Sequence, residues 1–162
     1  MANLRSLMMI ILFSVTAFIT AEAQDIRSWK VKDVARFINE SDSVLVISFW
    51  ATFCKPCVEE IPYLESISKK YRDHKVKVLL VSMDLPDFFP GKIASFVKKN
   101  NYSSQVVWLN ETNADYFCPA IDKSWSGVIP STMIINKKAG YKKFIEEQMK
   151  PLQFEAELKK AL

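Results

Sequence analysis

The motif Cys54-Lys55-Pro56-Cys57 places two thiols at a spacing that permits reversible disulfide chemistry. The dense apolar run over 44–50 predicts a buried strand just before the pair, and the apolar spacing after it predicts an amphipathic helix. The unpaired N–H groups and the positive dipole end of a helix start stabilise a thiolate, which is the nucleophile in disulfide exchange. We therefore expect Cys54 to attack, and Cys57, about one helical turn further on, to resolve the mixed disulfide.

The two residues between the cysteines suit the same chemistry. Pro56 fits the first turn of a helix, where its missing N–H removes no hydrogen bond. Lys55 adds positive charge beside the nucleophile and so favours the thiolate, unless its side chain simply points to solvent.

A structural disulfide and half of a zinc site are the alternative interpretations of the cysteine pair. A disulfide across so few residues would close only a tiny loop and add little stability. Zinc would need two more ligands, and the chain has only Cys118 and His74 to supply them. The redox interpretation is therefore favoured.

Two stretches of the chain resemble a known superfamily. Residues 49–62 (FWATFCKPCVEEIP) resemble the active-site sequence of the thioredoxin superfamily. More narrowly, they are similar to the secreted TlpA/ResA-like thiol-disulfide oxidoreductases, whose pattern is Trp-Ala-x-x-Cys-x-Pro-Cys followed by Glu-x-Pro. Residues 128–132 (VIPST) resemble the cis-proline loop of the same superfamily. The resemblance implies a thioredoxin-like α/β fold and an enzyme that exchanges thiols and disulfides.

The resemblance also implies roles for residues outside the cysteine pair. Pro130, in the cis form, would lie beside the pair and leave the backbone of Ile129 free to bind an extended substrate. Trp50 would shield the pair from water, although an aromatic residue at a strand end is more often part of the core. Trp125 fits the substrate groove and plain packing equally well.

The family's proton acceptor has no obvious counterpart in this sequence. Thioredoxin has a buried aspartate beneath its active site, where this chain has Ser48, which accepts no proton at neutral pH. The resemblance to ResA implies a glutamate shortly after the second strand of the fold, and residues 83–87 (MDLPD) contain none. Asp84 or Asp87 is therefore a candidate to take the Cys57 proton, although aspartate in a proline-containing loop is more often a turn or cap residue.

Hydrophobic periodicity predicts one α/β domain around the motif. Strands separated by helices, followed by a hairpin and a last helix, give a mixed central sheet flanked by helices. A helix–strand unit over 90–109 resembles the insertion that TlpA/ResA-like proteins carry. The predicted helices cover 31–40, 55–71, a segment opening at 90, 114–118 and 151–162, and the predicted strands cover 44–50, 76–83, 105–109, 131–136 and 141–146.

The first 23 residues have the pattern of a secretory signal peptide. Arg5 is followed by an apolar stretch over 7–19 and by Ala21-Glu22-Ala23 as a cleavage site. This stretch is shorter than the roughly 20 residues of a membrane-spanning helix. Residues 24–162 would then form one thioredoxin-like domain, with its core over about 41–162, soluble in an extracytoplasmic, periplasmic compartment where disulfides persist.

Composition and resemblance together restrict the partners. The 22 basic and 18 acidic residues give a net charge of +4, with the lysines spread in pairs, which is not the pattern of a nucleic-acid binder. The resemblance implies no cofactor other than the Cys54–Cys57 disulfide and no metal. It implies a disulfide-bearing substrate protein and a membrane-bound thiol donor of electrons, because we expect the pair to act as a mild reductant.

Two other functions remain open from the sequence, and one cysteine has no assigned role. A non-catalytic module could hold a client or partner in the same groove without using the cysteines. A thiol peroxidase is disfavoured because Thr52 stands two residues before Cys54, not three, and no proline precedes it. Cys118, beside Pro119 among apolar residues, is expected to be a buried, unreactive thiol.

Overall fold

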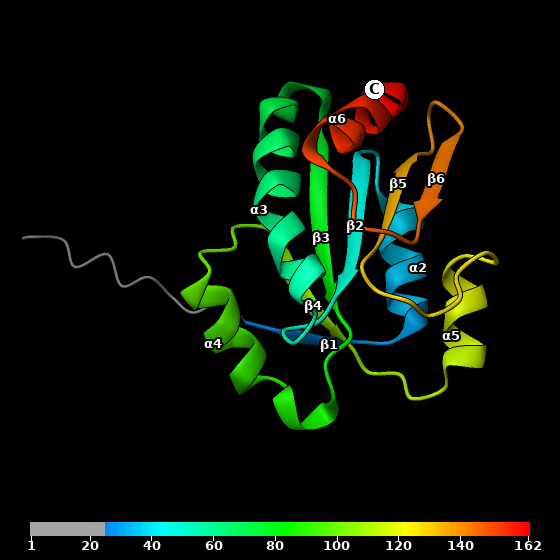
Figure 1. The fold of residues 1–162 in the computed structure, drawn as a ribbon. Helices are drawn as coiled ribbons and strands as arrows, with labels where there is room; N and C mark the ends of the chain where they lie inside the picture. Colours follow the sequence, from blue (N-terminus) through cyan, green and yellow to red (C-terminus); the bar gives the residue numbers. More distant parts are fainter. Residues whose placement is uncertain (1–24) are drawn as a thin grey trace, which may run out of the picture.

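The computed structural model describes residues 25–162, which build a six-stranded sheet with helices on both faces (Figure 1). The strand order is β1-β4-β3-β2-β5-β6, in which the first four strands run parallel and β5 runs antiparallel to both β2 and β6. The strands are β1 (Arg27–Trp29), β2 (Val44–Trp50), β3 (Val76–Ser82), β4 (Gln105–Leu109), β5 (Ser131–Asn136) and β6 (Tyr141–Ile145). The predicted α/β class with a mixed central sheet is confirmed.

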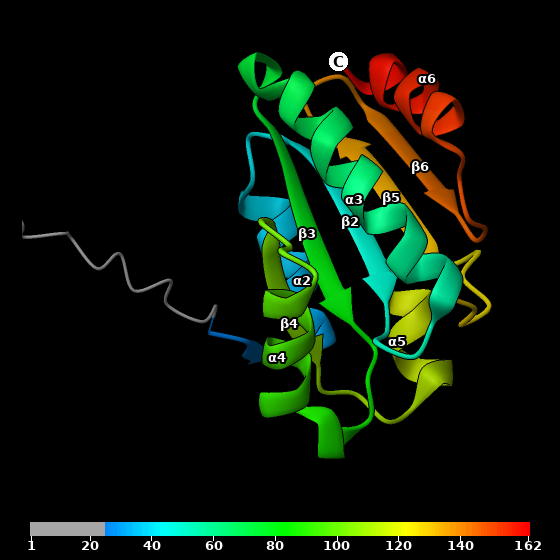
Figure 2. The same ribbon diagram turned by 60° about the vertical axis from the view of Figure 1, so that its left-hand side comes forward.

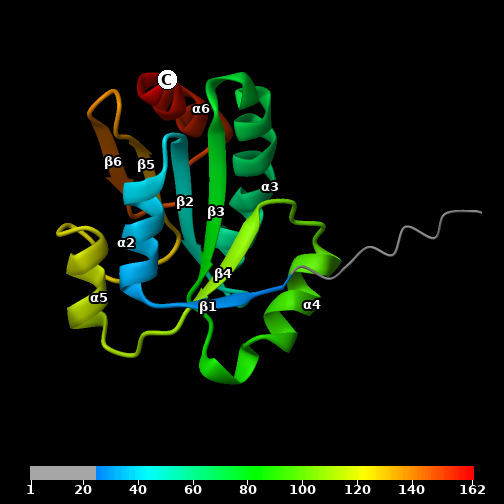
Figure 3. The same cartoon turned by 180° about the vertical axis from the view of Figure 1, so that it is seen from behind.

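Within residues 25–162, five α-helices and two short 3-10 helices lie between or after these strands. They are α2 (Val31–Glu40), α3 (Lys55–Lys70), α4 (Gly91–Lys99), α5 (Ala114–Ile121), α6 (Pro151–Ala161), η1 (Arg72–His74) and η2 (Pro86–Phe88). Helices α3 and α6 lie side by side on one face of the sheet (Figure 2), and α2 and α5 cover the opposite face (Figure 3). The predicted signal peptide lies outside the described residues.

Strand β2 occupies the centre of the sheet, and all seven of its residues are buried. Its side chains alternate between the two faces. Ile47 and Phe49 join the cluster beneath α2 and α5, whereas Val44 and Val46 pack with residues of α3 and α6. A strand covered on both faces has no polar side to expose, which explains the continuous apolar run in the sequence.

The segment between β3 and β4 forms the predicted insertion, with η2 and α4 leading into β4. Helix α4 buries Ile93 and Val97 in the same cluster as Leu80 of β3. Pro90 is the residue before the first turn of α4 rather than part of it, and its peptide bond with Phe89 is cis.

Strand β1 was not predicted from the sequence. It is three residues long and pairs with β4 at the edge of the sheet, with Ser28 opposite Trp108. Among residues 25–162, no helix combines the length and the apolar character that a membrane crossing requires.

We expect Phe154→Ala to destabilise the fold strongly. Phe154 of α6 is completely buried against the sheet, so its truncation should lower the free energy of unfolding by about 3–5 kcal/mol. Leu152, two residues earlier on the same helix, is 83% exposed, and Leu152→Ala should change stability by less than about 0.5 kcal/mol. Urea denaturation of the oxidised protein measures both. Equal losses for the two variants would contradict the packing of α6.

Candidate active site

Cys54 and Cys57 form a disulfide at the junction between β2 and α3, with their Cα atoms 5.3 Å apart. Cys54 is the residue that caps the start of α3, and Cys57 lies in the first turn. The Cys54 N–H donates to the carbonyl of Ala51 at 3.0 Å, which closes a tight turn between the strand and the helix. Cys54 is 9% exposed and Cys57 is 0% exposed, so Cys54 is the more accessible of the two.

Trp50 and Ile129 lie in the same apolar cluster as the two cysteines. Trp50 is fully buried and contacts Tyr102 edge-to-face, with their ring centroids 5.6 Å apart. Ile129 is partly buried and packs against this cluster, and its peptide bond with Pro130 is cis. The structure therefore brings Cys54, Cys57, Trp50 and Ile129 together, with buried Pro130 directly following Ile129.

The loop before Pro130 is held at the carbonyl of Val128. This oxygen accepts hydrogen bonds from Trp125 Nε1 at 3.0 Å and from the Ser131 hydroxyl at 2.6 Å. Trp125 itself is 4% exposed, and its ring centroid lies 4.5 Å from that of Phe49. Of the two roles left open for Trp125, the structure favours packing, because its side chain lies in the core beneath the loop.

Exposed apolar side chains occur in the segments that contribute to the cysteine site. Phe53, which directly precedes Cys54, is 63% exposed, and Val128, which precedes the Ile129–Pro130 bond, is 53% exposed. Leu85 is 62% exposed and follows Asp84, whose carboxylate accepts a hydrogen bond from Thr52. Large apolar side chains left in water around a reactive group are typical of a binding surface.

Lys55 points away from the site. Its side chain is 87% exposed, and its Nζ lies 3.8 Å from a carboxylate oxygen of Glu59, one turn further along α3. The neighbouring carboxylate offsets part of the lysine charge, and solvent screens such an exposed pair. Pro56 is exposed in the first turn of α3.

Asp84 does not bond to either cysteine in the structure. Its carboxylate accepts the Thr52 N–H at 3.1 and 3.2 Å, the Thr52 hydroxyl at 2.6 Å and the Ser82 hydroxyl at 2.8 Å. These contacts use the carboxylate to join the end of β3 to the turn that leads into Cys54. Asp87 is exposed in η2.

Glu60 is the site residue that the sequence reasoning missed. It lies three residues after Cys57 on α3, a spacing that puts two side chains on the same side of a helix. Glu60 is completely buried; its Oε1 accepts a hydrogen bond of 3.4 Å from the Thr132 hydroxyl, and its Oε2 has no partner in residues 25–162. Burial raises the pKa of Glu60 to about 7, against smaller lowering contributions from the backbone of Met149 and from Thr132.

Ser48 belongs to the same buried polar group beneath α3. It stands opposite Thr132 in the pairing of β2 with β5, and its hydroxyl has no partner among the described residues. Side chains directly opposite in an antiparallel pair lie on the same face, so Ser48, Thr132 and Glu60 lie together. The signal in the sequence was a glutamate on the otherwise apolar side of α3, next to Ile61.

Cys118 takes no part in this site. It is a free thiol, 4% exposed, on α5. Burial, and then the charges of Glu146 and Asp115, raise the pKa of its thiol. The expected buried state of Cys118 is confirmed.

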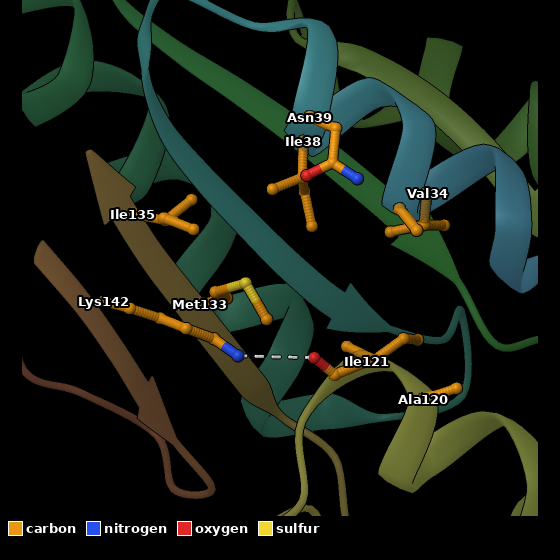
Figure 4. Close-up of a pocket in the computed structure, with 9 residues that line it drawn as sticks. Val34, Ile38, Asn39, Ala120, Ile121, Met133, Ile135 and Lys142 are labelled. Atoms are coloured by element: carbon orange, nitrogen blue, oxygen red, sulfur yellow. Dashed lines mark hydrogen bonds between the residues drawn. The ribbon is translucent and has the colours of Figure 1, made fainter. Parts of the chain in front are cut away.

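A separate pocket lies on the face of the sheet that is opposite to α3, between α2, α5 and β5 (Figure 4). It encloses about 170 Å³ and is lined mainly by apolar side chains, among them Val34, Ile121 and Met133. Lys142 lies at its edge, where its Nζ contacts the Ile121 carbonyl. No lining residue belongs to the cysteine site.

Within residues 25–162 there is also no group of three or more His, Cys, Asp or Glu side chains arranged to hold a metal ion.

Residues 14–140 match the model of the AhpC/TSA family. The chain belongs to this family. Among curated relatives of this AhpC/TSA member, the thiol-disulfide oxidoreductase ResA of Bacillus thuringiensis strain Al Hakam is 30% identical over 122 residues, and that of subspecies konkukian is 29% identical over 121. Each match covers 70% of this chain, and the chain spans 61% of the length of these relatives.

Solved structures show the same fold. A thioredoxin-related protein from Neisseria meningitidis serogroup B superposes with a TM-score of 0.61 at 23% identity, covering 76% of this chain and 89% of the other. StoA from Bacillus subtilis superposes with a TM-score of 0.53 at 21% identity, covering 74% and 84%. The predicted thioredoxin-like fold and the TlpA/ResA-like resemblance are confirmed.

We expect the buried Glu60 to make the stability of the oxidised protein fall as pH rises from about 4.5 to 7. The folded-state pKa is raised, so in this range the folded protein retains a proton that the unfolded chain has released, and deprotonation favours unfolding. A shift from 4.5 to about 7 corresponds to about 3 kcal/mol.

Glu60→Gln should remove this dependence, and urea denaturation across the pH range measures it. Glu59→Gln, one position earlier on the exposed side of α3, is the matched control and should keep the wild-type slope. Identical slopes for wild type and Glu60→Gln would contradict the assignment.

Proposed function

We propose that this chain is an extracytoplasmic thiol-disulfide oxidoreductase that reduces disulfides in other proteins. The observation that carries the proposal is the Cys54–Cys57 disulfide at the start of α3, with Cys57 fully buried and Cys54 9% exposed. Curated relatives that bear the name thiol-disulfide oxidoreductase support it.

The reaction begins with both cysteines reduced. The Cys54 thiolate attacks one sulfur of the substrate disulfide; the Cys54–substrate bond forms, the substrate S–S bond breaks, and one substrate thiolate leaves. Cys57 then loses its proton and attacks the Cys54 sulfur, which forms the Cys54–Cys57 disulfide and releases the second substrate thiolate. The substrate gains two electrons, and the enzyme loses two.

Glu60 is the side chain best suited to accept the Cys57 proton. Its pKa of about 7 is close to the working pH, its Oε2 has no other partner, and it lies one turn from Cys57. Asp84, proposed from the sequence, is less suited because its two oxygens already accept hydrogen bonds from Thr52 and Ser82.

The substrate would lie across Cys54 in extended form. The backbone of Ile129, before the cis Pro130, is the proposed strand-pairing partner of the substrate. The exposed side chains of Phe53, Leu85 and Val128 would contact apolar substrate residues beside the disulfide. Trp50, packed with both cysteines, would keep water from the pair, and Lys55 and Pro56 would form the outer turn.

Electrons would come from a membrane-bound thiol donor, because a reductant outside the cytoplasm must itself be reduced again. The proposed location rests on the signal-like residues 1–23, so the mature domain would begin at Gln24 and act in the periplasm. No cofactor other than the cysteine pair is needed for the exchange. A protein disulfide is the proposed substrate class.

Cysteine variants test the enzyme against a non-catalytic client-binding module. Cys54→Ser should abolish the reduction of insulin disulfides, whereas Cys57→Ser should trap a mixed disulfide between Cys54 and the substrate. Insulin turbidity and non-reducing gels with mass spectrometry measure the two effects, with Cys118→Ser as the control that retains activity. A wild-type pair that does not reduce insulin, while client binding persists, would favour the non-catalytic module.

The reduction potential tests the direction of the reaction. We expect a value nearer the roughly −270 mV of thioredoxin than the roughly −120 mV of DsbA. No histidine stands between the cysteines to stabilise the reduced form, and the Lys55 charge is partly offset by Glu59. Equilibration with glutathione measures the potential. A midpoint above about −180 mV would assign the protein to oxidation or isomerisation instead.

A further inference from the structure

We propose that Asp84 is a positioning residue for the nucleophile: its carboxylate fixes the turn at Thr52 that places Cys54 directly before α3. The inference rests on the proposed function and adds a residue that acts through the turn, without touching the substrate or the reacting sulfurs.

The Asp84 carboxylate joins Ser82 at the end of β3 to Thr52 in the turn before Cys54, and we call this set of hydrogen bonds the clamp. The residue is 4% exposed, and one backbone N–H and two hydroxyl groups donate to its carboxylate. Thr52 supplies both its N–H and its hydroxyl, at 3.1 and 2.6 Å, so its backbone and its side chain are held together. Hydrogen bonds to a carboxylate are among the stronger ones in proteins.

The clamp is itself fixed to the sheet and to the insertion. The Asp84 carbonyl accepts Trp108 Nε1 at 2.8 Å, and Trp108 stacks on Phe89 with ring centroids 4.5 Å apart. The Met83 N–H donates to the Trp50 carbonyl at 2.7 Å, which continues the pairing of β2 with β3 up to Asp84. Because both ends of the clamp are anchored, its carboxylate has one position relative to the turn.

Thr52 is where that restraint acts on Cys54. The Cys54 N–H donates to the Ala51 carbonyl, so Thr52 and Phe53 are the two central residues of the turn. Fixing the N–H and the side chain of Thr52 fixes how the chain leaves β2, and therefore how Cys54 meets the free N–H groups of α3. Those groups stabilise the thiolate only when its sulfur is correctly placed.

A second effect of Asp84 would act in the opposite direction. A buried negative charge near a thiol disfavours the thiolate and raises the thiol pKa. If charge dominated, removing it would lower the Cys54 pKa; if positioning dominates, loosening the turn should raise it. The sign of the change therefore distinguishes the two effects.

Thr52→Val is the decisive variant, because it removes one hydrogen bond of the clamp and leaves the Asp84 charge in place. The rate at which iodoacetamide alkylates Cys54 in the reduced protein, measured against pH with the site assigned by mass spectrometry, gives the Cys54 pKa. We expect the pKa to rise in both Thr52→Val and Asp84→Asn, by about one unit in the latter, which is a tenfold lower thiolate fraction below the pKa. Thr112→Val, at an exposed threonine far from the site in sequence, is the control and should match wild type.

Three outcomes would overturn the inference. An unchanged Cys54 pKa in both clamp variants would show that the turn needs no clamp. A lower pKa in Asp84→Asn, with no change in Thr52→Val, would show that charge and not positioning is the role of Asp84. A variant that loses stability in urea while its Cys54 pKa stays at the wild-type value would show a structural role only. Failure of the proposed function is distinct, because wild type itself would then not reduce insulin.

Discussion

The chemistry of this protein depends on one junction, where a strand buried on both faces gives way to a helix within four residues. Strand β2 is fixed by parallel pairing with β3 and antiparallel pairing with β5, so its last residue, Trp50, has a single position in the sheet. The turn from Ala51 to Cys54 then sets a sulfur at the start of α3. A thiolate is stabilised by donors or positive charge close to its sulfur, and a helix start is a place where free backbone N–H groups occur. The burial of β2 therefore fixes the candidate active site as well as the fold.

The buried acid of this site stands on the helix and not on the strand. Ser48 of β2 stands opposite Thr132 of β5, and the Thr132 hydroxyl donates to Glu60, which reaches this group from α3. A carboxylate on the same helix as Cys57 keeps its spacing to that cysteine through the helix geometry alone. Burial raises its pKa to about 7, because the lowering effects of the Met149 backbone and of the long Thr132 hydrogen bond are smaller. Such a carboxyl group can gain or lose a proton near neutral pH, and the folded protein is less stable when the group is charged.

Periodicity and motif predicted the sheet, the long helices and the cysteine junction because those features have strong local signals. The three residues of β1 have no such signal, since their place in the sheet comes from pairing with β4 far along the chain. Glu60 was missed for a related reason: a single glutamate within a helix is ordinarily exposed, and only the packing of α3 against β2 and β5 shows that it is buried. The partners of Asp84 were equally hidden, because Thr52 lies 32 residues away in the sequence. What the sequence could not supply is the set of contacts between distant segments.

The two strands that pair with β2 bring further residues of the candidate site to the junction between β2 and α3. Strand β3 ends beside β2 and delivers Asp84 to one flank of the turn, whereas β5 begins on the other side, after the loop that carries Ile129 and Pro130. Each flank is held from within, by the Thr52 contacts on one side and by the two hydrogen bonds to the Val128 carbonyl on the other. Phe53, Leu85 and Val128 leave exposed apolar side chains on these flanks, and the charged side chains of Lys55 and Glu59 are exposed at the start of α3. Exposed apolar side chains are typical of a binding surface, so the strand order that positions the cysteine pair also places candidate binding residues on either side of it.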